Sequence, residues 1–514
     1  MVYADLDMAI TLTEKERQIC DLLEDVVKYI HRQNIPNRPQ LVLRIAGGWV
    51  RDKLLGRESH DIDIAIDHMS GYDLAEHVNE YLKEHSYPVH SIAKISQNPE
   101  RSKHLETATT TVLGQAVDFV NLRSETYNSD SRIPQIEFGT PTDDALRRDI
   151  TINALFYNIH TRMVEDFTGK GLDDLRAGIV RTPLDPFTTF TDDPLRVLRV
   201  LRFASRFAFA IHPLTADAIS RPEIKHDLEA KISRERVGVE LDKMAAGPHP
   251  LLSIEMIVNY GVYTTTFRAP SPHSGSPVMA SELQAVELTR NVLAILDGEA
   301  ATGVDQSMAN YIIASELPDA LVTATDAQAR RALILAAYAY PYHAVSVRDR
   351  KRTVPAALVV IRDGVKLSTH DATTTVALHE AAAMIAAVAQ QCLDGTIDRV
   401  TLGQQIRQTG ARWAMSVLFA AAVDMLENKT PLEHVGSKYR AYFAKVAEYD
   451  LAEAYGYKPI VDGKAAARIL GIKPGPVLKR VLDMVMVWQL RNSDGSQQEC
   501  EAYIADIISQ EIQK

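Results

Sequence analysis

The sequence contains little cysteine: only Cys20, Cys392 and Cys500 occur among 514 residues. Three thiols cannot form a complete disulfide framework, and their separations match no CxxC metal pattern. A domain held together by a set of disulfides is therefore excluded. The simple interpretation is a protein of a reducing compartment.

Long hydrophobic runs are also missing. The richest, Ala332–Tyr340, is short and is followed by Pro341, whereas a membrane helix needs about 20 apolar residues. The first residues, MVYADLDMAITLTEKE, are acidic early and lack the Arg-rich amphipathic character of a transit peptide. We therefore expect no membrane partner and a location in the cytoplasm, the nucleus or both. A longer mitochondrial form with an upstream start is compatible with this sequence.

Basic charge is in deficit. The chain has 56 Lys and Arg against 67 Asp and Glu, a formal net charge of -11, which argues against a uniformly basic nucleic-acid binder. Hydrophobic residues make up 46% and charged residues 24%, which excludes a disordered or fibrous chain. At roughly 150 residues per domain, the length predicts about three domains.

The secondary-structure signal changes along the chain. Short β-rich runs (LVLRIAG, HDIDIAID, AVDFVNLR and QIEFG) occur within residues 41–165, and helical segments separate several of them. Farther on, Ala, Leu, Glu and Arg dominate at helical spacing. We predict an α+β domain with a mixed sheet, followed by a mostly α-helical remainder.

The sharpest signal is a strand that carries two carboxylates. Strand side chains alternate between faces, so Asp61 and Asp63 should lie side by side on one face. The opposite face should enter the core through Ile62, Ile64 and Ile66. Two adjacent carboxylates repel each other unless a cation lies between them, and Mg²⁺ suits this role because it takes oxygen ligands and leaves positions for phosphates.

A Gly-Gly turn precedes this strand. Gly47 and Gly48 open a short helical stretch, whose first N–H groups can receive a phosphate. Taken alone, Gly-Gly is usually a turn, and alternating Asp is usually solvated surface. Together the two features are typical of metal-assisted phosphoryl transfer.

The combined pattern GGxxRDxLLGxxxxDxD resembles the signature of nucleotidyltransferases of the DNA polymerase beta superfamily. In particular it resembles the class that contains tRNA nucleotidyltransferases (CCA-adding enzymes) and bacterial poly(A) polymerases. The resemblance implies that two Mg²⁺ ions are held by Asp61 and Asp63. It also implies nucleotide-binding roles for Gly47, Gly48, Arg51 and Asp52.

Asp118 is a third candidate metal ligand. It lies in a β-rich run with Val117 and Phe119 on the opposite face, and the superfamily places a third acidic residue beside the DxD. The alternative is an ordinary strand Asp. Asp67 shares the DxD face but lies at the strand end, where we expect no role.

A second motif, RRDxTxNA, spans residues 147–154. An arginine pair beside an Asp can be a surface ion cluster of little weight. In the family, however, this motif contacts the ribose and helps to select NTP over dNTP, because a carboxylate can accept a hydrogen bond from a 2′-OH. The resemblance assigns this role to Arg147, Arg148, Asp149 and Asn153.

A third motif, DDPLR, resembles the family's EDxxR element, which reads the incoming base. Its carboxylate and guanidinium can pair with the edges of C and A, whereas U and G place a carbonyl oxygen against the carboxylate. The matching pair is Asp193 and Arg196. Capping alone would explain Asp193, since Pro194 suits a first helical position. Asp192 stands where the motif usually has Glu, and its role is left open.

Arginines recur at helical spacing after this motif, so we expect a local basic face at Arg196, Arg199, Arg202 and Arg206. Arg199 is grouped with the nucleotide-binding residues. Three further stretches also resemble family elements: a capping loop at 166–175, a flexible loop at 95–115 and an ERxxxE element that matches Glu235, Arg236 and Glu240.

Near the C-terminus, a turn with basic residues resembles the family's tRNA-contacting tail. The implied RNA-binding residues are Lys464, Lys473, Lys479 and Arg480. The alternative is a loop between helices with solvated lysines.

The resemblance implies five segments and one reaction. The segments are an N-terminal helical extension (1–40), a nucleotidyltransferase head (41–165), a helical neck with the base-selecting template (166–268), a helical body (269–450) and a helical tail that contacts tRNA (451–514). The expected reaction adds C, C and A to the tRNA 3′ end from CTP and ATP, and we expect a monomer whose grip on tRNA is local and salt-sensitive. The alternatives are a poly(A) polymerase or partial CC- or A-adding relative, and a non-catalytic RNA-binding protein.

Overall fold

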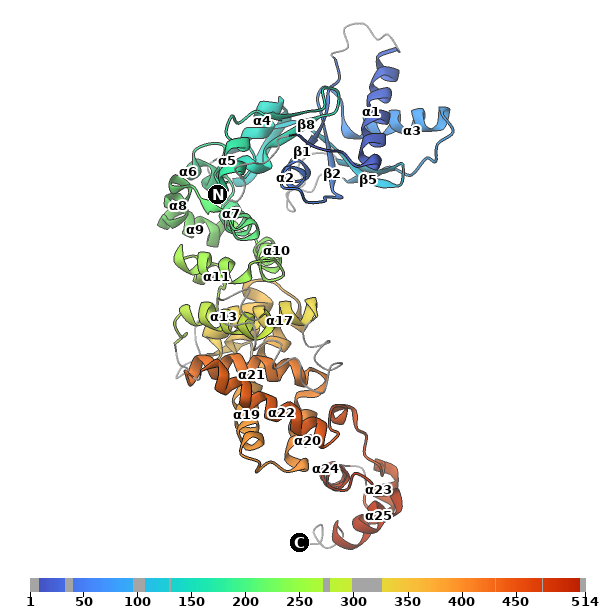
Figure 1. Ribbon diagram of the computed structural model, residues 1–514, viewed down its shortest axis with the longest axis vertical. Helices are drawn as coiled ribbons and strands as arrows, with labels where there is room; N and C mark the ends of the chain where they lie inside the picture. Colours follow the sequence, from blue (N-terminus) through green and yellow to red (C-terminus); the bar gives the residue numbers. More distant parts are fainter. Residues whose placement is uncertain are drawn as a thin grey trace. The chain divides into compact units, whose positions relative to one another are not determined.

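The computed structural model describes residues 9–32, 40–95, 107–128, 131–270, 278–297, 326–429, 431–473 and 475–508. The chain divides into two compact units, Met1–Thr266 and Phe267–Lys514, which Figure 1 colours from blue to green and from yellow to red. This division lies close to the predicted boundary between neck and body. The finer division into five segments stays a prediction.

The N-terminal unit is built on a seven-stranded sheet with the order β3-β4-β5-β2-β1-β8-β9. Its central pair, β2 and β5, is parallel and its other neighbours are antiparallel, so the predicted mixed sheet of an α+β domain is confirmed. The strands of this sheet are β1 (Leu43–Ala46), β2 (Ile62–Ile66), β3 (Ala93–Ile95), β4 (Thr107–Val112), β5 (Gln115–Asn121), β8 (Leu155–Asn158) and β9 (Met163–Asp166). Short separate pairs are formed by β6 (Arg123–Asn128) with β7 (Ser131–Phe138) and by β10 (Ile179–Val180) with β11 (Ala210–Ile211).

The sheet's alternation is the one that the sequence predicts. All three isoleucines of β2 are buried, and so are Val117 and Phe119 of β5. The register pairs Asp63 with Asp118. Burial of one face thus brings the carboxylates of two strands together on the other.

Two N-terminal helices complete this part of the unit, α1 (Glu14–Arg32) and α3 (Gly71–Glu84), which lie beside the sheet in Figure 1. Apolar side chains three or four residues apart form the buried face of α1, which packs against α3. Glu16 of α1 also accepts hydrogen bonds from Trp49 Nε1 at 3.1 Å and Lys53 Nζ at 2.8 Å. The described part of the predicted extension therefore belongs to the N-terminal unit.

Helices make up the rest of this unit. They are α2 (Gly48–Leu54), α4 (Pro141–Leu146), the 3₁₀ turn η2 (Thr151–Asn153), α5 (Gly171–Ala177), α6 (Pro186–Asp192), α7 (Leu195–Phe207), α8 (Pro213–Ser220), α9 (Pro222–Lys231), α10 (Arg234–Ala245), α11 (Pro250–Asn259) and α12 (Tyr263–Thr266). In the predicted capping loop, Asp166 accepts from the backbone N–H groups of Thr168 and Leu172, each at 3.1 Å. This loop therefore fixes the start of α5.

The C-terminal unit is mostly helical, as predicted. Its helices are α13 (Leu283–Asp297), α17 (Ala327–Tyr338), α18 (Ala356–Val359), α19 (Thr369–Leu393), α20 (Arg399–Thr409), α21 (Trp413–Glu427), α22 (Leu432–Glu448), α23 (Gly463–Leu470), α24 (Pro476–Arg491) and α25 (Gln497–Tyr503). Shorter turns are η3 (Tyr340–Tyr342), η5 (Gly410–Arg412) and η6 (Ala454–Gly456), with π-helical turns η4 (Val360–Gly364) and η7 (Ile504–Ile508). One hairpin, β12 (Ser346–Asp349) with β13 (Arg352–Pro355), joins them.

Helix α19 corrects one sequence prediction. With 25 residues and a mean hydropathy of 1.3 over its best window, it is long and apolar enough to cross a membrane by length and composition. Its buried side chains, including Leu378 and Ile385, pack within the unit against α17, α21 and α22. The statement that no stretch reaches this length is therefore wrong, and packing assigns the helix to the core of this unit.

Candidate active site

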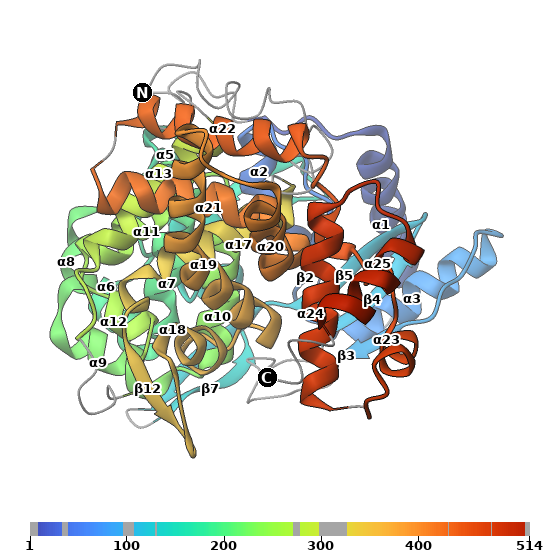
Figure 2. The same ribbon diagram turned by 90° about the horizontal axis from the view of Figure 1, so that it is seen from below.

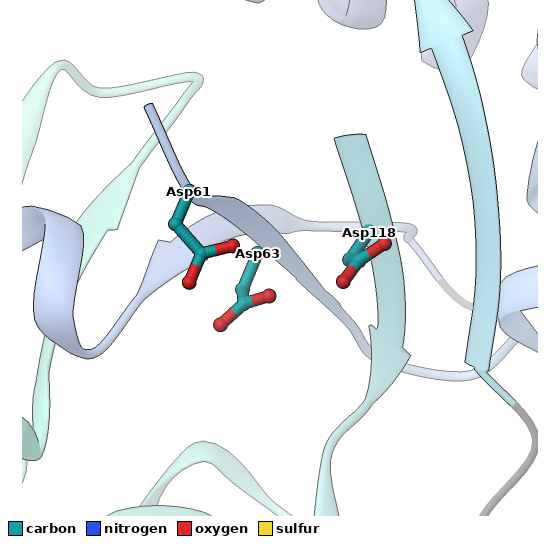
Figure 3. Close-up of side chains that lie close together, drawn as sticks. All are labelled: Asp61, Asp63 and Asp118. Atoms are coloured by element: carbon teal, nitrogen blue, oxygen red, sulfur yellow. The ribbon is translucent and has the colours of Figure 1, made fainter. Parts of the chain in front are cut away.

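Three carboxylates meet at the centre of the sheet (Figure 3). Asp61 immediately precedes β2, Asp63 lies within it and Asp118 is its register partner on β5. One oxygen from each lies within 4.8 Å of the others. Thr109 on β4 donates its hydroxyl to Asp118 Oδ1 at 2.5 Å, which orients that carboxylate. The three predicted ligands are thus brought into one cluster.

Asp63 lies between the other two carboxylates of this cluster (Figure 3). Its burial, together with the negative charges of Asp61 and Asp118, raises its pKa to about 7, although the nearby Arg148 guanidinium opposes the shift. Carboxylates crowded in this way share a site only when a proton or a cation offsets their charge. All-oxygen donors at this spacing suit a hard divalent cation such as Mg²⁺.

The Gly-Gly turn lies against the RRD motif. Gly47 has a φ of 74°, a left-handed conformation that favours glycine. A Cβ at this position would lie 2.6 Å from Arg148 Nη1, so a larger residue would displace the arginine. Arg148 also donates to the Asn153 carbonyl at 3.0 Å. The turn and the motif therefore fit each other as one structure.

Asp144, which sequence reasoning did not single out, holds both arginines of the motif. It is 2% exposed and accepts from Arg147 Nε at 2.9 Å and from Arg148 Nη2 at 2.8 Å. Burial alone would raise the pKa of Asp144, but the charges and hydrogen bonds of the two guanidinium groups outweigh this effect and lower the pKa. Its position three and four residues before the arginines, on the same helical turn, is the signal that could have revealed it.

Asp149 accepts three hydrogen bonds. Its Oδ1 accepts from the Ile150 N–H at 2.9 Å and from Asn153 Nδ2 at 3.1 Å, and its Oδ2 accepts from Arg199 Nε at 2.7 Å. Burial alone would raise its pKa, but the charge of Arg199 and the hydrogen bonds lower the pKa to about 2. Asp149 is therefore an anionic acceptor at neutral pH.

Arg51 and Asp52 are both buried. Arg51 donates to Asp52 Oδ1 at 2.8 Å and to the Asn153 side chain, and its guanidinium lies 5.1 and 4.7 Å from the ring centroids of Phe203 and Phe207 on α7. These contacts join α2 to α7, and the nucleotide contact of Arg51 and Asp52 stays a prediction.

Asp193 is held by Arg236, which belongs to the ERxxxE element. Arg236 donates to both carboxylate oxygens of Asp193, from Nη1 to Oδ1 at 3.2 Å and from Nη2 to Oδ2 at 2.7 Å. The predicted cap is displaced by one residue, because α7 begins at Leu195, whose N–H donates to Asp193 Oδ1 at 3.3 Å. Asp193 therefore accepts from the first N–H of α7 and from the guanidinium of Arg236.

The arginine stripe on α7 is not the open basic face that we expected. Arg196 and Arg202 are buried. Arg196 donates to the Arg147 carbonyl at 2.7 Å, while Glu240 pairs with Arg202 and lies 3.6 Å from Arg199. Arg206 lies 3.5 Å from Asp52. The stripe's charge is thus largely neutralised inside the protein, because the predicted face packs against the motifs.

Two other predictions fall elsewhere. Residues 96–106 of the expected flexible loop (95–115) lie outside the described residues. The prediction is wrong for the part that follows, because it forms β4 and the start of β5. In the tail, all four predicted RNA-binding side chains are exposed: Lys464, Lys473, Lys479 and Arg480. They belong to the C-terminal unit and are not part of the carboxylate site.

Comparison with known proteins gives matches over the whole chain. The Poly A polymerase head domain matches residues 43–181, and a family described as the probable RNA and SrmB-binding site of polymerase A matches residues 208–273. The CCA tRNA nucleotidyltransferase, mitochondrial, of Candida glabrata is 38% identical, with 98% of this chain and 97% of the relative covered. The Saccharomyces cerevisiae protein of the same name is also 38% identical, with 97% and 94% covered.

The fold is similar to that of solved CCA-adding enzymes. The Bacillus stearothermophilus enzyme in complex with CTP has a TM-score of 0.61 at 20% identity, with 98% of this chain and 100% of that chain covered. The Thermotoga maritima enzyme complexed with tRNA has a TM-score of 0.57 at 18% identity, with 96% and 95% covered.

Proposed function

We propose that this chain, which belongs to the CCA tRNA nucleotidyltransferase family, adds C, C and A to the 3′ end of tRNA from CTP and ATP. The observation that carries the proposal is the cluster of Asp61, Asp63 and Asp118, whose oxygens lie within 4.8 Å of one another. It lies in the same unit as Asp149 and as Asp193 and Arg196, to which we assign recognition of the ribose and the base. A decayed, purely RNA-binding relative would have no need to keep these carboxylates together.

The cluster fits a divalent metal. Its donors are all carboxylates, and the raised pKa of Asp63 reports negative charge that a cation would offset. We propose that the three side chains hold two Mg²⁺ ions. When bound, such ions lower the pKa of an attacking hydroxyl and neutralise charge on the triphosphate.

The protein's own groups then select and orient the nucleotide. Asp149 is ionised and its Oδ2 faces Arg199, and a carboxylate offers about four acceptor positions. A 2′-OH can take an acceptor position that remains, whereas a deoxyribose leaves it empty. Arg147 and Arg148, each held by Asp144, keep their guanidinium groups fixed for contact with sugar and phosphate.

Base choice is assigned to Asp193 and Arg196. Asp193 would accept from the amino group of C or A, and Arg196 would donate to the neighbouring ring acceptor. Arg236 keeps the carboxylate oriented. U and G would place a carbonyl oxygen against this carboxylate and be rejected. Replacement of Arg196 by Ala should therefore lower the preference for CTP over UTP, and an unchanged ratio would count against this template.

One experiment tests the reaction. The full chain is incubated with Mg²⁺, CTP, ATP and a tRNA that ends at the discriminator base, and the product ends are sequenced. Addition of CCA followed by a stop supports the proposal. A long A tail would support a poly(A) polymerase, which the match to the polymerase head family also suggests, and no extension would support an RNA-binding module. The Asp63→Ala variant should bind tRNA without extending it.

Oligomeric state and location can be tested separately. We propose a monomer, which light scattering on the eluting protein can check. Two relatives carry a mitochondrial name, which supports a mitochondrial pool besides the cytoplasmic or nuclear one that we expect. Expression of the gene with its own upstream region and a C-terminal fluorescent tag would show whether such a pool exists.

A further inference from the structure

We propose that the β12–β13 hairpin of the C-terminal unit is a contact surface for the phosphate backbone of RNA; that this RNA is tRNA rests on the proposed function. Figure 2 shows the two strands projecting beyond α18. The hairpin lies outside the predicted tail and outside the carboxylate site. It is therefore a separate RNA-binding element.

The turn of this hairpin has an arginine in a backbone conformation that arginine rarely adopts. The register pairs Asp349 with Arg352 and leaves Arg350 and Lys351 as the two turn residues. Arg350 has a φ of 55°, a conformation usual for Gly, Asn and Asp in two-residue hairpin turns. A long basic side chain thus occupies a position where glycine would be less strained. Such an outlier is a reason to look for a function at the turn.

The base of the hairpin is firmly anchored. Val347 is 0% exposed and Val345 is 4% exposed. The Ala356 N–H donates to the Val345 carbonyl at 2.8 Å, and α18 packs against both strands. The projecting turn is consequently presented by a fixed platform, so that binding need not order a mobile loop.

Basic charge is concentrated at the exposed end. The side chains of Arg348, Arg350, Lys351 and Arg352 are all exposed. Asp349 and Asp363 are both engaged by Arg362, which lies 3.0 Å from Asp349 and 2.5 Å from Asp363. No ion pair of the described residues involves the four exposed basic side chains of the hairpin. This local positive charge contrasts with the chain's net charge of -11.

The chemistry of the hairpin fits a phosphate backbone. Residues 346–355 contain no aromatic side chain, so the hairpin lacks the platform on which proteins stack unpaired bases. Its exposed groups are guanidinium and ammonium donors, which contact phosphates without reading sequence. Binding should accordingly depend on salt and not on the RNA sequence.

The test replaces all four basic residues of the hairpin by Gln in the full chain. Anisotropy with labelled tRNA should show affinity reduced about 10- to 100-fold at low salt, and the slope of log affinity against log salt reduced by about one per lost phosphate contact. The KM for tRNA should rise, while the KM for CTP and the maximal rate at saturating tRNA stay unchanged. A charge-matched control replaces four exposed, ion-paired residues of the catalytic unit by Gln: Arg17, Lys28, Arg176 and Arg221. It should bind tRNA like the wild type.

A single variant separates binding from folding. Arg350→Gly removes one charge and relieves the left-handed backbone, so it should weaken tRNA binding a few-fold without lowering the melting temperature. Two results would overturn the proposal. One is a Gln variant that keeps the wild-type affinity and salt slope. The other is a Gln variant that loses binding to phosphatidylserine vesicles but keeps its binding to RNA. If the wild type fails to extend tRNA but binds RNA through the hairpin, the proposed function fails and the hairpin proposal stands.

Discussion

The two units treat positive charge in opposite ways. In the catalytic unit, Arg51, Arg196 and Arg202 are buried and donate to fixed carboxylates, amides or carbonyls. In the C-terminal unit, basic side chains of the hairpin and the tail are exposed. Buried forks set geometry at short range and are little affected by salt, whereas exposed cations supply affinity that salt weakens. Loss of the first kind should therefore damage rate or folding, and loss of the second should damage affinity.

One buried cation in the C-terminal unit refines this comparison. Lys438 on α22 donates to Asp424 on α21 at 2.7 Å, and Tyr439 donates to the same oxygen at 3.3 Å. This pair joins two core helices. Burial alone is therefore not the distinguishing feature; in the catalytic unit the buried cations connect motifs with each other.

The largest effect is expected at the carboxylate cluster. Asp118→Ala should lower the rate of CMP addition by about 10³-fold or more, because a metal ligand stabilises the transition state by several kcal/mol. Binding of tRNA, to which the hairpin and tail of the other unit contribute in our proposal, should change little. Single-turnover incorporation and tRNA anisotropy measure the two quantities. If tRNA binding fell together with rate, the separation of roles between the units would be broken.

A matched variant sharpens this test. Thr109→Val removes only the hydroxyl that orients Asp118, and loss of such a supporting hydrogen bond typically costs about 10- to 100-fold in activity or metal affinity. A rate equal to that of the wild type would show that Asp118 needs no orientation from β4.

Next in size is the stability of the neck. Arg202→Met leaves Glu240, which is 3% exposed, without its strongest partner, and removal of one member of a buried ion pair costs about 3–5 kcal/mol. Urea unfolding of the variant should shift accordingly. The double variant Arg202→Met/Glu240→Leu should recover most of the loss, because it leaves no buried charge unpaired. Equal instability of the single and double variants would contradict this account.

Protonation of the carboxylate cluster gives a third test. Folding raises the pKa of Asp63 from 3.8 to about 7, so the folded chain retains a proton that the unfolded chain has lost. The stability linked to this group is fully present below pH 3.8 and is lost as the pH rises through about 7. Mg²⁺ must displace the proton, so its affinity should rise about tenfold per pH unit up to that value and then level off. Calorimetric titration measures this dependence, and Asp63→Asn should abolish it.

A smaller effect is expected at Arg51. Arg51→Lys retains the charge but loses the fork that contacts Asn153 and Asp52 together. Because Asn153 supports Asp149, we expect discrimination between CTP and dCTP to fall roughly tenfold, about 1.4 kcal/mol, with a smaller change in the KM for tRNA. Discrimination that stays at the wild-type value would show that Arg51 stabilises the fold without positioning the ribose carboxylate.

The smallest effects per residue belong to the tail. Replacement of Lys464, Lys473, Lys479 and Arg480 by Gln should weaken tRNA binding and lower the salt slope by about one per lost phosphate contact. The rate at saturating tRNA should not change. A lower rate with unchanged affinity would reverse the assignment of roles to the two units.

Local patterns predicted much of the fold and part of the site. Strand alternation was enough to put Asp61 and Asp63 on one face. When every second side chain of a strand is buried, the side chains between them must point to the opposite face. Asp118 needed in addition the knowledge that β5 lies beside β2. The length of α19 was missed because Glu380 and His379 interrupt its apolar sequence.

The partners of the arginines could not be predicted in this way. The spacing of the α7 arginines correctly indicated one side of a helix, but not what packs against that side. The pairs with Asp149, Glu240 and Asp52 join residues far apart in sequence, and no local pattern specifies them. For the same reason the sequence did not reveal that Arg236 donates to the carboxylate of Asp193.

The aromatic clasp around Arg51 has a consequence for protein engineering. Phe203 and Phe207 of α7 lie against the Arg51 guanidinium of α2. When segments are exchanged between relatives, α7 and the glycine turn should therefore be exchanged together. A chimera that imports the DDPLR segment from a relative with another nucleotide preference would need to import both phenylalanines and the matching GGxxRD segment. If all of α7 were exchanged for a helix that lacks these phenylalanines, the Arg51 guanidinium would face a cavity, and the hybrid would fail for reasons unrelated to base choice.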